Sequence, residues 1–411
     1  MKAVVDRSGP KGKFLIFAAA AIGILSSVGE NRPNLTGFWS LVPLLWLEAE
    51  SRRSAVLAAF AFYFSLSRGI VPGSYVFFRD GSLIRAFTLW FLSAAALALP
   101  WGLFWSARSP ARRACGVMLA VFSSIPPPLG LIGWGNPLMG AGLFFPGFRW
   151  YGLAFMPALY VGAALCPKLR RGLIVFVLLA APCLRVPAVS ENISLGDVTI
   201  LGLNTSFGRM ASGSGDFDSQ YERERAVFQY MNEKERNGEL EDADIVILPE
   251  TIIGRMNPTT RKRWRKLFEP FAEKGTMFVA GAEIPSIGGP KYDNTMVLFE
   301  ANGVYQVAKQ RFPVPFSMYQ PFSGEGANAY LSSPGGVSIM EVHGKRLGFL
   351  VCYEQFLTWP FLSLVSQKPD AIIAPSNLWW CKDTSLPGIQ AAATRLWARL
   401  FGVASITAVN R

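Results

Sequence analysis

Hydrophobic and polar positions divide the chain into two parts near residue 189. In the first part, long apolar runs recur with short polar breaks between them. These runs are 14–29, 38–48, 55–72, 86–106, 114–134, 151–167 and 172–189. Because a bilayer crossing needs about 20 mostly apolar residues, the pattern predicts a polytopic transmembrane domain over residues 1–189, an α-helical bundle with about seven transmembrane helices. The run 38–48 is short for a crossing.

After residue 189, shorter apolar runs alternate with charged stretches. The charged stretches 218–240 and 258–274 predict surface helices, and residues 211–216 predict a flexible loop. The strand-like runs are 197–204, 244–250, 276–282, 294–300, 303–309, 336–342, 346–352, 370–376 and 403–409. Alternating helices and strands, with paired strands in the middle, favour a layered α/β domain over residues 190–411.

The charge of the chain is as uneven as its hydropathy. Hydrophobic residues make up 51% of the 411 residues and charged residues 17%, which is typical of a membrane protein. Residues 1–189 hold 18 Lys/Arg and five Asp/Glu, a net charge of +13, whereas residues 190–411 are at −1. Since the basic excess lies between apolar runs, we interpret it as a determinant of membrane orientation and predict no nucleic-acid binding.

Twelve of the 18 basic residues fall into segments that lie on one side of the membrane if every run crosses. They are Lys2, Arg7, Lys11, Lys13, Arg52, Arg53, Arg108, Arg112, Arg113, Lys168, Arg170 and Arg171. Because Lys and Arg are enriched in cytoplasmic loops, the amino terminus is predicted to be cytoplasmic. Seven crossings of a bacterial inner membrane then place residues from about 190 onward in the periplasm.

Three strand-like runs of the second part end in a residue whose side chain could take part in a chemical reaction. Cys352 follows the apolar run Gly348-Phe-Leu-Val where a helix is expected to begin, and a helix amino terminus or a nearby cation lowers the pKa of a thiol. Glu250 ends a hydrophobic strand, where partial burial raises the pKa of a carboxyl toward that of a base. Lys309 ends a third strand, where its charge could stabilise an oxyanion.

Taken singly, each of these residues also has a structural interpretation. A lone cysteine after a strand is most often a core residue, a glutamate after proline often lies in a turn, and Lys309 could be a solvated surface charge. The chain has a single histidine, His343. A Ser-His-Asp or Cys-His catalytic site is therefore excluded unless His343 is its histidine. No CxxC or histidine cluster suggests a metal, and no cofactor is predicted.

The longer motifs around these residues resemble the nitrilase (carbon–nitrogen hydrolase) superfamily. Leu248-Pro-Glu-Thr is similar to its glutamate motif, Lys309-Gln-Arg-Phe-Pro-Val-Pro-Phe to its lysine motif, and Val351-Cys-Tyr-Glu to its nucleophile motif. Tyr292-Asp-Asn-Thr and Pro375-Ser-Asn-Leu-Trp resemble flanking strands. The resemblance implies an α-β-β-α sandwich and a catalytic triad of Glu250, Lys309 and Cys352, with Tyr353 and Glu354 in supporting positions.

A membrane bundle ahead of a periplasmic nitrilase-like domain resembles the layout of apolipoprotein N-acyltransferases. That resemblance implies a membrane phospholipid as acyl donor, a cysteine thioester, and a protein or small amine as acceptor. The whole chain also resembles membrane proteins of plasmid conjugal transfer, which implies the conjugation machinery as a partner. Two further functions stay open, a non-catalytic conjugation accessory protein and a membrane-tethered amidase.

The chain departs from the acyltransferase pattern at three places. Val314-Pro-Phe is followed by Ser317-Met-Tyr instead of Gly-Glu, so that one supporting carboxylate is missing. The lysine motif has an extra residue before Val-Pro-Phe, which makes the assignment of Lys309 weaker than that of Cys352. The sequence ends at Arg411, without the final hairpin and closing transmembrane helix of those enzymes, which puts ordinary lipoprotein maturation in doubt.

Overall fold

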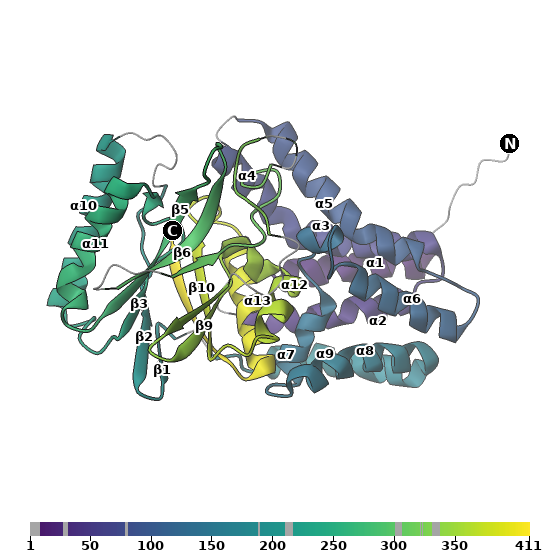
Figure 1. The fold of residues 1–411 in the computed structure, drawn as a ribbon. Helices are drawn as coiled ribbons and strands as arrows, with labels where there is room; N and C mark the ends of the chain where they lie inside the picture. The colour runs from purple at the N-terminus through teal and green to yellow at the C-terminus, as the bar shows by residue number, and fades with distance from the viewer. Residues whose placement is uncertain are drawn as a thin grey trace. The chain divides into compact units, whose positions relative to one another are not determined.

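The computed structural model describes residues 9–27, 32–78, 81–187, 190–209, 217–300, 306–320, 322, 324–330 and 338–411. The loop predicted at 211–216 and the first residues of the strands predicted at 303–309 and 336–342 lie outside the described residues. The chain folds into two compact units (Figure 1). The helical unit contains residues 1–187, 356–359 and 381–402, and the α/β unit contains 188–355, 360–380 and 403–411.

Every apolar run of the first part contains helix. The elements of the helical unit are α1 Pro10–Leu25, η1 Pro33–Ser40, α2 Leu41–Leu47, α3 Arg52–Leu66, η2 Ser67–Gly69, α4 Ile70–Phe78, α5 Leu83–Leu103, α6 Pro110–Ser123, η3 Leu129–Leu131, η4 Pro137–Gly140, α7 Ala141–Phe144, α8 Arg149–Leu165, α9 Pro167–Cys183 and α13 Leu386–Phe401. Helix α1 packs against α3, α3 against α5, and α8 against both α6 and α9.

Two described stretches are long and apolar enough to cross a membrane, namely the continuous helical stretch Arg52–Phe78 and Leu83–Leu103. The predicted bundle of about seven transmembrane helices is therefore not confirmed. The physical reason is length, because α8 and α9 have 17 residues each and α1 has 16. The short run 38–48 does form helix, but the first eight residues of its helical segment are a 3₁₀-helix, η1.

The helical segment 33–47 runs antiparallel to α9 over the length of that helix. At one end, Asn34 Nδ2 donates to the carbonyl oxygens of Ala181 (3.0 Å) and Pro182 (3.1 Å), in the last turn of α9. At the other end, Arg170 Nε in the first turn of α9 lies 2.6 Å from Glu48 Oε1. A 3₁₀-helix rises about 2.0 Å per residue and an α-helix about 1.5 Å, so that 33–47 and α9 both span about 26 Å.

Several segments with predicted cytoplasmic residues meet at this second end. Lys11 Nζ lies 3.2 Å from Glu48 Oε2 and 3.4 Å from Glu50 Oε1. Arg113 Nη1 donates to the Leu47 carbonyl oxygen at 3.1 Å. The start of α1, the end of α2 with the residues after it, and the starts of α6 and α9 therefore lie together.

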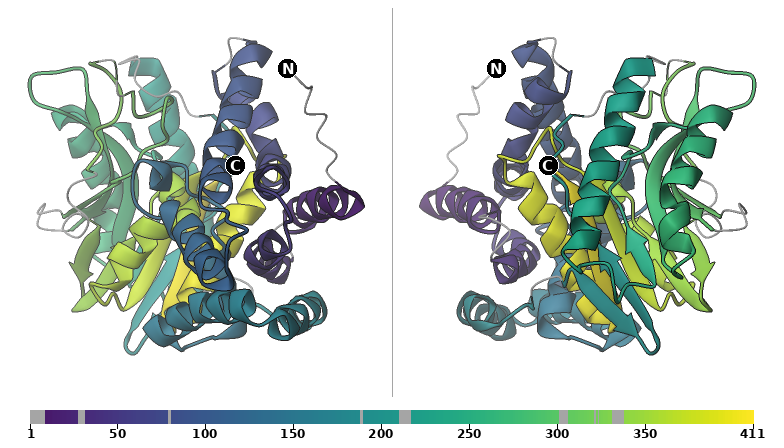
Figure 2. Two further views of the ribbon diagram at one scale, coloured as in Figure 1. Left: turned by 90° about the vertical axis from the view of Figure 1, so that its right-hand side faces the viewer. Right: turned by 90° about the vertical axis from the view of Figure 1, so that its left-hand side faces the viewer.

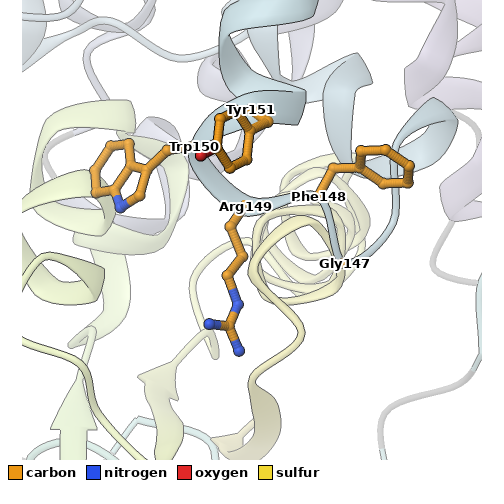
Figure 3. A pocket seen from close by; sticks show the side chains of 5 residues that line it. All are labelled: Gly147, Phe148, Arg149, Trp150 and Tyr151. Atoms are coloured by element: carbon orange, nitrogen blue, oxygen red, sulfur yellow. The ribbon is translucent and has the colours of Figure 1, made fainter.

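The other end of the helical unit holds α13. Its 16 residues include 13 buried ones, and a Cβ added to Gly142 of α7 would come within 1.9 Å of the Leu396 carbonyl oxygen. Gly147 N donates to the Arg399 carbonyl oxygen at 2.9 Å. Nearby, Gly147 and the first residues of α8 line a hollow of about 420 Å³ with exposed aromatic side chains (Figure 3).

The α/β unit contains two sheets. Its strands are β1 Asn192–Leu195, β2 Val198–Gly202, β3 Ile245–Ile247, β4 Gly254–Arg255, β5 Met277–Pro285, β6 Tyr292–Phe299, β7 Val307–Lys309, β8 Ile339–Val342, β9 Lys345–Phe349, β10 Ala371–Asn377 and β11 Ala404–Asn410. The seven-stranded sheet has the order β1-β2-β3-β5-β6-β7 with β4 on β5, and the four-stranded sheet the order β11-β10-β9-β8. Strands β2, β3 and β5 are parallel, as are β9, β10 and β11.

Parallel neighbours need crossover connections, and α10 Phe217–Arg236 and α11 Pro258–Ala272 provide those of the larger sheet (Figure 2). Both helices contribute to one core with β3, β5 and β6, in which Val227, Trp264 and Phe278 are fully buried. Helix α11 begins at Pro258 because Asn257 Oδ1 accepts hydrogen bonds from two amides of the first turn, both at 2.9 Å. The α/β fold predicted for the second part is confirmed.

Candidate active site

Glu250 leaves β3 through a sharp turn that the neighbouring strand accommodates. The three residues of β3 are fully buried, and the chain turns at Thr251, which has a φ of +54°. In β5, a Cβ on Gly281 would lie 2.5 Å from Glu250 Cα and 2.3 Å from Thr251 N. Only glycine lets the turn approach β5 so closely, and this contact fixes the direction of the Glu250 side chain.

The Glu250 carboxylate is 3% exposed and has three hydrogen-bond partners. Oε1 accepts from Asn294 Nδ2 at 2.6 Å, and Oε2 accepts from the backbone N of Asn377 at 3.0 Å. The third partner is the side chain of Cys352. Burial raises the pKa of the Glu250 carboxyl to about 7, although the bonds from Cys352, Asn294 and Asn377 oppose this shift.

Cys352 is buried next to this carboxylate, in a strained backbone conformation. The chain leaves β9 at Phe349, and Cys352 has a φ of +47°, a left-handed value that costs a non-glycine residue about 1–3 kcal/mol. The helix expected to begin here is a short 3₁₀-helix, Cys352–Phe356. Strain at a turn between strand and helix holds the thiol at the Glu250 carboxylate.

The two supporting residues predicted beside Cys352 have different surroundings. Glu354 is fully buried and accepts hydrogen bonds from the backbone N of Val351 (3.0 Å), Arg311 (2.8 Å) and Phe312 (3.2 Å). It therefore ties the nucleophile turn to the segment after β7 (Val307–Lys309). Tyr353 is partly buried, and burial raises the pKa of its hydroxyl.

The described contacts of Lys309 are with Asp293 and Tyr330. Its Nζ lies 2.7 Å from Asp293 Oδ2 and donates to the Tyr330 hydroxyl at 3.2 Å. Burial alone would lower the pKa of the ammonium, but the bonds to Asp293 and Tyr330 outweigh it and raise this pKa. The structure thus brings together Glu250 and Cys352, while Lys309 pairs with Asp293.

Three residues of the site were not singled out in the sequence. Asn294 and Asn377 donate to Glu250, and Gln310, which is 1% exposed, bonds to Asn294 and to the carbonyl oxygen of Val351. Asn294 and Asn377 belong to the motifs interpreted as flanking strands. The sequence signal for Gln310 is the extra residue before Val-Pro-Phe, which shifts the lysine motif by one position.

This arrangement supplies a nucleophile and a base in one hydrogen-bonded pair. A buried carboxyl with a pKa near 7 can exchange a proton with a thiol at neutral pH. Among the described residues, no group of three or more His, Cys, Asp or Glu side chains could hold a metal ion. The chain is therefore an α/β protein in which a buried carboxylate–thiol pair, Glu250 and Cys352, follows strands β3 and β9.

Comparison with known proteins shows similarity over most of the chain to conjugal transfer proteins. The chain is 29% identical over 379 residues to a probable conjugal transfer protein TraB of Sinorhizobium fredii, covering 90% of each chain. It is 29% identical over 417 residues to the conjugal transfer protein TraB of Agrobacterium fabrum, covering 96% of this chain and 92% of that one. The predicted resemblance to conjugal transfer proteins is confirmed, and no protein-family model matches the chain.

Solved structures match part of the chain. A variant of the Nesterenkonia AN1 amidase from the nitrilase superfamily is 15% identical, with a TM-score of 0.38, over 54% of this chain and 79% of that one. A carbon–nitrogen hydrolase from Helicobacter pylori G27 is 15% identical, with a TM-score of 0.36, over 51% of this chain and 72% of that one.

Proposed function

We propose that the protein is a membrane-bound enzyme of nitrilase type that transfers an acyl group through a thioester on Cys352. The donor is a membrane phospholipid, the acceptor is an amine of a protein or small molecule, and the reaction serves plasmid conjugal transfer. The observation that carries the proposal is the buried hydrogen bond between Cys352 and Glu250. The names of the two TraB relatives support the link to conjugation.

The reaction needs one base and one nucleophile. Glu250 accepts the Cys352 proton while Sγ attacks the acyl carbonyl carbon, and the departing lipid alcohol takes that proton back from Glu250. The acceptor amine then attacks the thioester, Glu250 removes the excess proton from its nitrogen, and the Cys352 thiolate leaves and is reprotonated. Water in place of the amine would give hydrolysis, the outcome of the amidase alternative.

The membrane topology that this function requires is a seven-crossing one with the α/β unit in the periplasm. It is supported by the helical segment 33–47, because this segment spans about the same 26 Å as α9. It is also supported by the contacts of Lys11, Arg113 and Arg170 at one end of the helical unit, since basic residues gather on the cytoplasmic side.

A reporter fused after residue 200 tests this topology. An exported alkaline phosphatase is expected to be active at this position, whereas a fluorescent protein that matures only in the cytoplasm is expected to stay dark. A fusion after Arg108, in a predicted cytoplasmic segment, serves as the matched control with the opposite pattern. Fluorescence after residue 200 would mean an even number of crossings and would remove the lipoprotein-like reaction.

The thioester itself is tested with a phospholipid that carries an alkyne-tagged acyl chain. The full-length protein in detergent is expected to take up the tag, and hydroxylamine, which cleaves thioesters, should release it. Cys352→Ala should remain unlabelled, whereas Cys381→Ala, which removes another buried cysteine, should label like the wild type. Equal labelling of Cys352→Ala and the wild type would refute the thioester.

The second candidate function is a non-catalytic accessory role in conjugation, which the names of the relatives would equally allow. Plasmid transfer by cells that carry Cys352→Ala distinguishes the two. A loss of transfer with normal protein levels supports chemistry at Cys352. Transfer at the wild-type frequency would favour the accessory role.

A further inference from the structure

Adjacent residues at the end of β7 have their side chains on opposite faces of the sheet. Lys309 lies opposite Thr295 of β6 in the antiparallel register, and Gln310 N donates to the Asn294 carbonyl oxygen at 2.8 Å. Successive side chains of a strand alternate between faces. The Lys309 side chain therefore shares a face with Asp293, while that of Gln310 shares a face with Asn294.

Hydrogen bonds connect Gln310 to both members of the reactive pair. Gln310 Oε1 accepts from Asn294 Nδ2 at 2.8 Å, and the same Nδ2 donates to Glu250 Oε1 at 2.6 Å. Gln310 Nε2 donates to the carbonyl oxygen of Val351 at 2.9 Å, and Val351 is bonded to Cys352. The Val351 carbonyl oxygen can only accept a hydrogen bond, so that it must face Nε2 of Gln310. Gln310 Oε1 then faces Asn294, which in turn must present Nδ2.

From these contacts we propose that Gln310, and not Lys309, is the third residue of the site. It is a neutral positioning residue that orients Glu250 through Asn294 and the Cys352 turn through Val351. Lys309 instead anchors the segment around Tyr330 to Asp293. The proposal rests on the proposed function in one respect, since it takes Glu250 and Cys352 as the reacting pair.

A neutral third residue changes the electrostatics of the pair. The ionisable groups that act on Glu250 include Cys352, Glu283 on β5 and Tyr292 on β6. Arg311, a buried cation in the segment after β7, is paired with Glu354 of the nucleophile turn. Because Gln310 is neutral, it adds no positive charge to the pair, and the carboxylate and the thiol share one proton.

The pH dependence of Cys352 alkylation tests this assignment without any knowledge of the substrate. Full-length protein in detergent is treated with iodoacetamide over a range of pH, and mass spectrometry follows the peptide that contains Cys352. Gln310→Lys is expected to lower the midpoint of the rate profile by about 1–3 pH units, because a cation beside the pair favours both anions. Lys309→Met, its neighbour on the opposite face, should leave the midpoint unchanged.

Lys309→Met alone is decisive if Gln310→Lys does not fold, because Lys309 is partly exposed and its loss should be tolerated. A midpoint that rises in Lys309→Met would show that its ammonium acts on the thiol and would overturn the proposal. A shift seen with Gln310→Lys but not with Lys309→Met supports it. Failure of the proposed function is seen separately, as a wild-type protein that takes up no acyl label but retains this pattern of alkylation.

Discussion

Replacing Glu250 with glutamine is expected to slow acylation of Cys352 by about 10²–10⁴-fold, the usual contribution of a general base. Glutamine can keep the hydrogen bond from Asn294 or that from the Asn377 amide, but it cannot accept the thiol proton. The rate of label uptake from the tagged phospholipid, measured on equal amounts of folded protein, gives the loss directly.

The same carboxyl should set the pH dependence of the reaction. Its folded-state pKa is raised from 4.5 to about 7, so the basic form is present above this pH and is lost as the pH falls through it. The wild-type acylation rate should therefore rise with pH around 7, and Glu250→Gln should lack this rise. Glu283→Gln removes a second buried carboxylate that acts on Glu250 through its charge, and should leave most of the rate intact. A wild-type rate in Glu250→Gln would exclude Glu250 as the base.

Replacing Glu354 with alanine is expected to lower the free energy of unfolding by about 3–5 kcal/mol, because it leaves the buried Arg311 guanidinium without its counter-charge. Three backbone amides would also lose their acceptor. Denaturant unfolding of the full chain in detergent, followed by tryptophan fluorescence, measures the change.

Glu341→Ala is the matched control for this variant. Glu341 is an exposed glutamate in β8, and surface substitutions usually stay within about 0.5 kcal/mol. If both variants unfold at the same denaturant concentration, Glu354 does not stabilise the nucleophile turn.

Because Glu354 holds the Cys352 turn to the segment after β7, the loss of the Glu354 side chain should also reduce Cys352 alkylation.

The sequence predicted β3, β5, β6 and β10 well because their apolar runs are buried on both faces, but it did not predict β1 and β4. It also placed Glu250 and Cys352 after strand ends, but their strands, β3 and β9, belong to different sheets, and the sequence alone does not show that the two side chains meet. The apolar pattern does not show which of Lys309 and Gln310 faces the site, since a shift of one residue in a strand exchanges the two faces. Only the register of β7 on β6 decides which of the two side chains lies at Glu250.

Two features of the helical unit could not be predicted from hydropathy. The run 38–48 is short in residues, and its reach depends on the 3₁₀ geometry of η1, which has no clear hydropathy signature. Helix α13 has an apolar sequence that fits a crossover helix between β10 and β11. Its contacts with α7 depend on close approach at Gly142, which only the three-dimensional structure reveals.

The position of α13 limits how such a protein can be recombined during evolution. Strands β10 and β11 are neighbours in the α/β unit, yet the helix that joins them along the chain belongs to the helical unit. A gene segment for residues 190–411 would encode α13 without the helices of residues 1–187 against which it packs, such as α7 and η1. The buried residues of α13, among them Leu396, would then be exposed. A hybrid with a foreign membrane part must therefore also adapt the buried face of α13.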